Sequence, residues 1–463
     1  MSSAKYFVIF VVFFLGGVVM DEFLREGDLV KVVVLGGAGV WLMRNVGWKV
    51  LVVGVAGILF GVLRFYASFF GMGDVGGVGE GVEFEGCIVA EVDVRTDMVK
   101  YTVWSDEYGR VLVNGNRYPV YEYGDCLRVW GELEIGGEID GFSYDKYLSR
   151  YGVSYVIYRA GVERVISDGG GVYGVLYWVK GWFEGRIEKV FAEPHGSFMA
   201  GLLLGSRKGI PDNLMESFNR TGLTHIIAIS GYNITIVIVV VSGMFGFLSR
   251  KWKVVACGVF IILFVLLVGA SAAVVRAAIM GVISLMALFY GRQYYVFISL
   301  FAAGFLMNLW NPKILVYDVG FQLSFLATLG IVVFAEELGK KFERVSGLFG
   351  IREALVMTFA VQVLALPLIV LNFGRLSLIS PLANVFVLPF IPFAMLFGFL
   401  GVLGGKIFGF FGYLILEFII FVVNLFSKIE WASLRIEWFS WWMFALYYLW
   451  IFGRVKKAIT SSI

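Results

Sequence analysis

Histidine and cysteine are scarce in this 463-residue sequence. The whole supply consists of His195, His225, Cys87, Cys126 and Cys257. Zinc and di-metal hydrolase sites need several such ligands at short spacings, so these sites are excluded and we expect no bound metal. The sequence also has no GxxxxGKS or GxxxxGKT phosphate-binding loop. We therefore expect no cofactor, and any step that consumes nucleotide energy must depend on a partner protein.

Charged residues are also few. They make up 16% of the chain, against about 25% in typical soluble domains, while 59% of residues are hydrophobic and the mean hydropathy is +0.83. These values exclude an ordinary soluble protein and indicate a membrane protein. The net charge of +3 is too small to indicate a nucleic-acid partner, because membrane proteins carry Lys and Arg in their cytoplasmic loops.

Apolar runs bounded by charge predict about twelve membrane segments. Lys5 precedes the first run, Arg44 and Lys49 lie between the second and third, and basic residues recur in every second later loop, including Lys406. This pattern places both termini in the cytoplasm. Runs interrupted by Gly or Pro could be re-entrant pieces rather than full spans, and this alternative stays open. The predicted segments are residues 5–20, 29–43, 48–66, 223–248, 253–270, 271–290, 294–310, 314–335, 351–371, 378–403, 407–426 and 438–453.

A charge-rich region interrupts the membrane segments. Residues 1–67 form N-terminal membrane helices, residues 68–168 an outer β domain, residues 169–222 interfacial helices, and residues 223–463 the main transmembrane domain. The β domain is predicted from five short runs rich in Val, Tyr and Ile and separated by Gly or Asn-Gly turns. Five strands suit an OB-type barrel, and an SH3-like barrel remains open. The predicted strands are residues 82–91, 98–105, 108–113, 125–134 and 153–166. The predicted fold class is thus a polytopic α-helical membrane protein with a small inserted all-β domain.

Aromatic residues on the predicted strands could stack on the bases of single-stranded nucleic acid, although strand aromatics are more often core residues. The charge balance of residues 80–167, with 16 acidic against 9 basic side chains, would repel phosphate groups except at a local patch. The core interpretation is therefore favoured. The aromatic residues concerned are Tyr101, Trp104, Tyr118, Tyr121, Tyr123 and Trp130.

Cys87 and Cys126 lie in the first and fourth predicted strands, which are neighbours in an OB barrel. On the oxidising side of a membrane they could form a disulfide. They could equally be two small buried hydrophobic residues.

Residues 171–190 have the pattern of an amphipathic helix in the outer membrane interface. Its aromatic and aliphatic residues recur at helical spacing and are predicted to lie opposite its charged residues. The apolar set is Trp178, Trp182, Phe183, Ile187, Val190 and Phe191, and the charged set is Lys180, Glu184, Arg186, Glu188 and Lys189.

Four stretches in the second half of the chain carry a family resemblance. They are residues 201–236 (GLLLGSRKGIPDNLMESFNRTGLTHIIAISGYNITI), 268–280 (VGASAAVVRAAIM), 311–331 (NPKILVYDVGFQLSFLATLGI) and 362–392 (QVLALPLIVLNFGRLSLISPLANVFVLPFIP). In this order the sequence resembles the ComEC family of competence proteins. The resemblance implies an inner-membrane channel that moves single-stranded DNA into the cytoplasm during natural transformation, with residues 223–463 as the competence-type transmembrane domain.

The sequence departs from this family in two respects. Many members have a His after the Ser-Gly pair of the first stretch, where this chain has Tyr232 and Asn233, so a role for that His does not carry over. Longer members also carry a metallo-β-lactamase-like domain thought to degrade the non-transported strand, and no HxHxDH motif occurs here. We therefore expect no enzyme activity. The expected partners are single-stranded DNA, membrane lipid, a cytoplasmic ATPase, an outer DNA receptor and a separate nuclease.

Arg276 is the leading candidate for the DNA path, because it lies well inside an apolar segment, where a charge is costly unless it faces a polar interior. The alternative is a structural Arg paired with a carbonyl group or with Asp318. Arg207, Lys208 and Arg220 would form the outer approach, in a region where residues 169–310 hold 11 basic and 5 acidic side chains. Further polar candidates at membrane depth are Ser230, Asn233, Gln322 and Asn384.

Two other functions are compatible with parts of the sequence. A secondary transporter or a lipid-linked-substrate flippase would suit the same topology, although the inverted halves typical of many transporters are not evident. A hydrolase using His225 and Ser230 is disfavoured, because the sequence shows no nucleophile elbow and no third orienting carboxylate.

Overall fold

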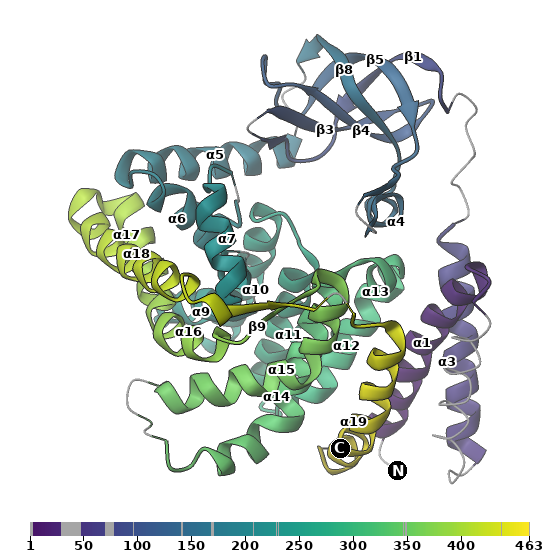
Figure 1. Cartoon of the computed structure of the whole chain (residues 1–463), viewed down its shortest axis with the longest axis vertical. Helices are drawn as coiled ribbons and strands as arrows, with labels where there is room; N and C mark the ends of the chain where they lie inside the picture. Colours follow the sequence, from purple (N-terminus) through teal and green to yellow (C-terminus); the bar gives the residue numbers. More distant parts are fainter. Residues whose placement is uncertain are drawn as a thin grey trace.

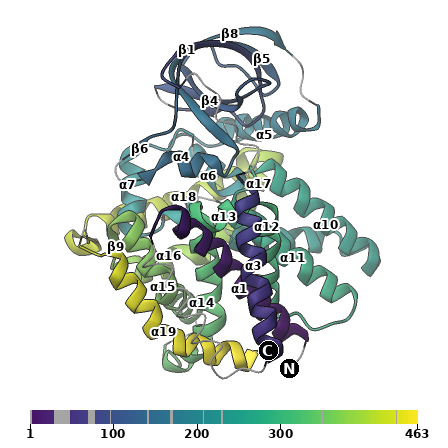
Figure 2. The same ribbon diagram turned by 90° about the vertical axis from the view of Figure 1, so that its right-hand side faces the viewer.

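A computed structural model describes residues 3–28, 48–69, 78–95, 97–139, 142–167, 171–206, 208–227, 229, 231–345, 347, 350–436 and 438–462. A body of helices carries a small β domain at one end (Figure 1). The first helix, α1 (Ser3–Arg25), begins near the point where the last helix, α19 (Trp441–Ser462), ends, and both points lie far from the β domain (Figures 1 and 2). The predicted membrane segment 29–43 lies outside the described residues.

The β domain is built from five long strands that follow the alternating pattern of the sequence. Its sheet has the order β1-β5-β8-β4-β3-β2, and β1 also pairs with β3, which closes the sheet on itself. β4 and β8 are parallel, whereas the other long neighbours are antiparallel. The strands are β1 (Gly81–Ile88), β2 (Asp93–Val94), β3 (Met98–Ser105), β4 (Gly109–Asn116), β5 (Asp125–Glu134) and β8 (Val153–Ser167), with the small hairpin β6 (Glu138–Ile139) and β7 (Phe142–Ser143).

The interior of the closed sheet is aliphatic. Val99, Tyr101 and Val103 of β3 are fully buried because alternate residues of a strand point to the same face. Tyr101 is therefore a core residue, but Trp104, Tyr118 and Trp130 are 47%, 73% and 45% exposed. The sequence did not predict α4 (Tyr144–Ser149), a short helix between β5 and β8 that packs on the outside of the sheet.

Cys87 and Cys126 lie directly opposite each other in the β1–β5 register, and a disulfide joins them. Cys257 is a buried free cysteine of the helical body.

The protein is a multi-pass helical membrane protein. Within the described ranges, seven helical segments are long and apolar enough to cross a membrane, fewer than the roughly twelve predicted. The predicted segment 223–248 is divided between α8 and α9, and α10 begins with Arg250, Lys251 and Lys253, which leave too short an apolar run. The seven are Ala4–Arg25, Trp48–Ala67, Ala272–Phe289, Val319–Lys341, Ile351–Phe373, Ser380–Gly404 and Lys406–Ser427.

The helices form two groups around different cores. The first group surrounds the largest buried cluster of aliphatic and aromatic side chains, and it joins helices from two distant parts of the chain. It contains α5 (Gly171–Val190), α6 (His195–Leu204), α7 (Asp212–Thr221), α8 (Thr224–Ile227), α16 (Ser380–Val387), the 3₁₀ turn η2 (Leu388–Phe390), α17 (Ile391–Gly404) and α18 (Lys406–Ser427).

The second group packs around α14, with α1 and α3 (Trp48–Ala67) as a paired arm at its side (Figure 2). Glycine allows the closest approaches in this group. A Cβ atom on Gly330 would overlap the carbonyl oxygen of Ala360, and one on Gly61 would overlap that of Phe14. The remaining helices are α9 (Gly231–Met244), α10 (Arg250–Leu267), α11 (Ala272–Phe289), α12 (Val296–Trp310), α13 (Lys313–Tyr317), α14 (Val319–Lys341), α15 (Ile351–Phe373) and α19; β9 (Arg375–Ser377) and β10 (Ser433–Arg435) form a small ribbon beside the turn η3 (Glu430–Ala432).

Helix α5 lies between the β domain and the helical body (Figure 1), but its charged and apolar faces are not arranged as predicted. Trp178 and Trp182 are 70% and 43% exposed, whereas Ile187 is fully buried in the first core. Lys180, predicted on the polar face, is buried because it meets a carboxylate of the β domain.

The turn before Lys406 contradicts one of two sequence predictions. The charge pattern placed this turn in the cytoplasm, whereas α5 was predicted in the outer interface. In the structure the two are adjacent: Arg186 of α5 donates to the Val402 carbonyl at 3.1 Å, and Gly409 packs on Val190. At most one of the two predictions can be correct, because the hydrocarbon core of a bilayer, about 30 Å thick, would separate the cytoplasmic from the outer side.

Candidate functional site

The Arg276 side chain lies inside the helical body, one turn into α11. It is 6% exposed, its Nε donates to the Ser324 hydroxyl at 2.8 Å, and its Nη1 lies 3.2 Å from the Met280 sulfur. A Cβ atom on Gly231 would lie 3.1 Å from Nη2, which is a tight contact, so glycine gives the guanidinium the most room here. The site thus unites the start of α9, the first turns of α11 and the upper part of α14.

The predicted alternative partner of Arg276, Asp318, is engaged elsewhere. Its carboxylate pairs with Arg150 of the β domain and accepts a hydrogen bond from the Phe321 N–H, which caps α14. Among the described residues, no carboxylate lies within 4.0 Å of the Arg276 guanidinium. A buried cation held by a neutral hydroxyl and a thioether keeps its attraction for an anion.

Three of the four stretches that carry the family resemblance meet at this site. Gly231 belongs to the first stretch, Arg276 to the second and Ser324 to the third. The fourth stretch contacts the first at another point, where a Cβ atom on Gly222 would lie 3.0 Å from the Cβ atom of Ser380. Gly231 and Ser324, which are far apart in the sequence, are thus brought together around Arg276.

The other predicted polar residues do not converge on Arg276. Asn233, in the first turn of α9, donates to the Leu202 carbonyl at 3.4 Å. Gln322 instead donates to the carbonyls of Leu315 and Val316 and so closes the end of α13. Asn384 lies in the first helix group, where its amide donates to the Thr358 hydroxyl at 3.1 Å and its Oδ1 is buried without a described partner.

The predicted outer approach is an ion network rather than a set of free cations. Lys208 lies 3.8 Å from both Glu91 and Glu184, and Lys180 lies 2.7 Å from Glu91. Glu91 also lies above the α10–α11 turn, 3.9 Å from the position of a Cβ atom on Gly269. The network therefore covers the chain just before Arg276. Sequence reasoning missed Glu91, because it is one acid among many in the β domain.

Arg220 lies apart from this network. Its Nη2 donates to the Ile429 carbonyl at 3.1 Å, and its Nε is buried without a partner in the described chain. Arg207 and Ser230 lie outside the described residues.

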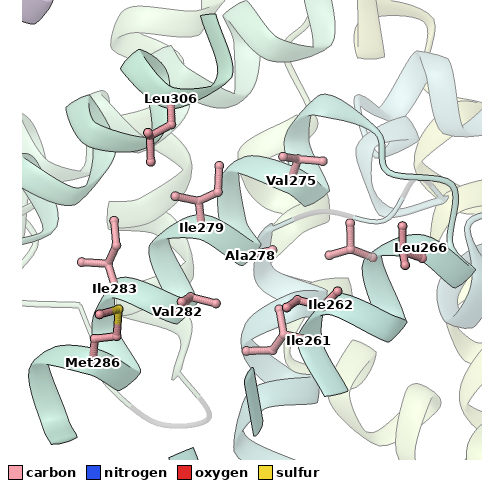
Figure 3. Close-up of a pocket in the computed structure, with 11 residues that line it drawn as sticks. Ile261, Ile262, Leu266, Val275, Ala278, Ile279, Val282, Ile283, Met286 and Leu306 are labelled. Carbon is pink, nitrogen blue, oxygen red and sulfur yellow. The ribbon is translucent and has the colours of Figure 1, made fainter. Parts of the chain in front are cut away.

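One cavity of the helical body lies beside α11 but is not lined by Arg276. It has a volume of about 420 Å³ and lies between α10, α11 and α12, and its labelled side chains face one another across the gap in Figure 3. All its lining atoms are apolar, as shown by Ile261, Val275, Ile279 and Leu306. Arg276 belongs to another face of α11, so the cavity does not suit a polyanion.

Sequence reasoning also missed a buried histidine in the first helix group. His195 Nε2 lies 2.7 Å from a carboxylate oxygen of Glu417, and its ring packs against Tyr413. The two residues are 222 positions apart, so no local pattern could pair them.

Comparisons with known proteins agree with the geometry of the four stretches. The Competence protein family matches residues 202–455, more than half of the chain. ComE operon protein 3 of Bacillus subtilis (strain 168) is 24% identical over 262 residues, which cover 56% of this chain and 32% of that protein. Competence protein ComA of Neisseria gonorrhoeae is 26% identical over 254 residues, or 51% of this chain and 35% of its own length.

The matched regions span only about a third of these curated relatives, and no solved structure matches the chain. The family match covers the Arg276 site and both helix groups from α6 onward. The chain belongs to the ComEC-type family of competence proteins.

Proposed function

We propose that this protein is an inner-membrane channel through which single-stranded DNA enters the cytoplasm during natural transformation. The observation that carries the proposal is the meeting of three family stretches at Arg276, a buried cation without a described carboxylate partner. A phosphate chain that crosses the hydrocarbon layer needs fixed positive charge and hydrogen-bond donors along its way. The guanidinium supplies both, and its Nη2 atom lies beside Gly231 at the start of α9.

Replacement of Arg276 tests this role. Arg276→Ala should lower entry of labelled DNA into the cytoplasm roughly ten- to hundredfold, the loss expected for a hydrogen bond to a charged group. Arg276→Lys should fail as well, because the ammonium lacks the planar fork that fits phosphate. Arg292→Ala, which removes an exposed arginine after α11, is the matched control and should leave uptake unchanged.

Protein level and membrane insertion must be measured for all three variants. Normal uptake with Arg276→Ala would contradict the proposal. Failure of both Arg276 variants to accumulate would show that the side chain is structural.

We further propose that the β domain is an OB-type barrel outside the membrane and that the chain performs no chemistry itself. Closure of the sheet by β1 and the parallel pair β4–β8 support the barrel assignment. A separate ATPase, an outer DNA receptor and a separate nuclease would then act as partners. Metal-dependent DNA cleavage by the pure protein that is lost on mutation of an internal residue would contradict the absence of catalysis.

We propose that both termini are cytoplasmic and that the Lys406 turn lies on the outer side with α5. The open end of the α17–α18 hairpin contacts α7 through Ser427 and Ser217, which favours a re-entrant hairpin over two full spans. Replacing two full spans by a re-entrant hairpin lowers the number of membrane crossings by two. The total stays even, so the C-terminus remains on the same side as the N-terminus.

Thiol labelling of intact cells tests this arrangement in a Cys257→Ser background. A membrane-impermeant reagent should label Lys406→Cys to the same extent as Val120→Cys, an outer control in the β domain. Lys251→Cys at the start of α10 is the cytoplasmic control and should react only after lysis. A Lys406→Cys variant that behaves like Lys251→Cys would restore the two-span interpretation.

A further inference from the structure

A second cavity of about 300 Å³ lies where three parts of the molecule meet. Its walls come from the end of α3, the residues after α4 of the β domain and the α12–α13 connection. Its polar lining includes three cations, and we call it the seam cavity. The polar residues that matter here are Arg64, Ser149, Arg150, Asn311 and Lys313.

Two of these cations are held in fixed positions. Arg64 donates from Nε to the Leu309 carbonyl and from Nη2 to the Trp310 carbonyl, both at 2.7 Å. The Arg150 side chain is only 9% exposed and lies over the rings of Tyr147 and Tyr151 at 4.1 and 4.4 Å. Its Nη1 pairs with Asp318, but its Nε is buried with no hydrogen-bond partner among the described residues.

Lys313 adds a third, more responsive charge. The residue is 3% exposed, and its ammonium lies 4.3 Å from the Phe69 ring centroid. Burial and the nearby positive charge of Arg25 lower the pKa of Lys313 to about 8, although Glu22 acts in the opposite direction. The ammonium would therefore gain from an anion in the cavity, and it is charged only below about this pH.

The local balance of charge is positive. Asp318 offsets Arg150, and Glu22 is already engaged by Lys146 and by the Tyr317 hydroxyl. No carboxylate is among the described residues that line the cavity. A buried, unsatisfied guanidinium N–H beside two more cations is the donor set that phosphate oxygens fit.

We propose that the seam cavity binds the phosphate of an anionic phospholipid headgroup. The cavity lies at the ends of α3 and α12, both apolar helices, so it is at headgroup level rather than in the hydrocarbon layer. Trp310, which lines it, is 87% exposed, and tryptophan is enriched at this level of a bilayer. Basic pockets between membrane helices are known to hold acidic headgroups.

The test uses the full chain in detergent, titrated with single lipids and followed by native mass spectrometry. Phosphatidylglycerol should bind, and a glycosyl diacylglycerol without phosphate should not. Lys313→Gln and Arg64→Gln should each weaken phosphatidylglycerol binding about tenfold, as expected for one charge-assisted contact. Arg435→Gln, at an exposed arginine of β10 away from the cavity, should have no effect.

A pH series adds a readout that loss of structure would not produce. Wild-type affinity should fall as pH rises through about 8, since Lys313 loses its proton there, whereas Lys313→Gln should show no such fall. Other charged groups around Lys313 are Arg25, Glu22, Arg64 and Arg150. Equal binding of both lipids, unchanged binding by both variants, or displacement by inorganic phosphate or a short oligonucleotide at equal concentration would each overturn the proposal.

Discussion

The helical core and the contact between the β domain and the helices, here called the seam, are held together by different forces. In the core, α14 and α15 touch through Gly330, with no charge involved. At the seam, the β domain is attached by ion pairs on two sides, Lys180 to Glu91 and Arg150 to Asp318. Close packing makes the core rigid, because a densely packed interior cannot accommodate added volume. Charge holds the seam through single side-chain contacts, each of which one substitution can remove.

The largest effect is expected in the core. Gly330→Leu would place a side chain on the Ala360 carbonyl oxygen, and neither backbone can move away. We expect a loss of about 3 kcal/mol or more, or no folded protein at all. Gly339→Leu on the same helix is the matched control, because no atom lies within 4 Å of the added Cβ there. Thermal unfolding in detergent measures the difference, and equal stability of the two variants would contradict the close packing of α14 and α15.

An intermediate effect is expected at the buried ion pair of the seam. Lys180→Met leaves the Glu91 carboxylate without its main partner, and we expect a loss of about 1–3 kcal/mol. The double variant Lys180→Met with Glu91→Gln should regain most of that stability, because no uncompensated charge remains. Lys189→Met, at an exposed position of the same helix, is the control. Additive losses in a double-mutant cycle would show that the two side chains do not interact.

The smallest effect is expected from Lys208→Gln. Its ammonium is partly exposed and lies 3.8 Å from each of two carboxylates, so its loss should change stability by less than about 0.5 kcal/mol. If Lys208 attracts phosphate, the variant should take up less DNA than the wild type at low ionic strength. Raised salt should remove this difference, because it screens the attraction. Uptake equal to wild type at every salt concentration would remove Lys208 from the approach.

Local patterns predicted what depends on local structure. Alternation found the five long strands, since side chains of a strand point to opposite faces, and the lone charge in an apolar run singled out Arg276. The facing positions of Cys87 and Cys126 followed from the expected strand order. These features need only a few neighbouring residues or a known topology.

Features that depend on distant partners were not predictable. Helical periodicity placed Lys180 on the polar face of α5. It could not predict that Lys180 is buried against Glu91, because Glu91 lies 89 residues earlier in the chain. Gln322 was predicted as a polar group of the DNA path at membrane depth, but no local pattern showed that its amide donates to the carbonyls that end α13. The charge rule assigned the Lys406 turn to the cytoplasm, and it could not show that Arg186 of α5 donates to the Val402 carbonyl beside this turn.

The bond from Arg64 to Leu309 has a consequence for biogenesis. Its two residues are 245 positions apart, so α3 leaves the ribosome long before its partner exists. At roughly 5–20 residues per second, the delay is about 12–50 s. During that interval the Arg64 guanidinium lacks the two carbonyl groups that it binds in the folded protein. The paired arm of α1 and α3 would therefore gain from a chaperone or insertase that shelters this arginine until α12 has been made.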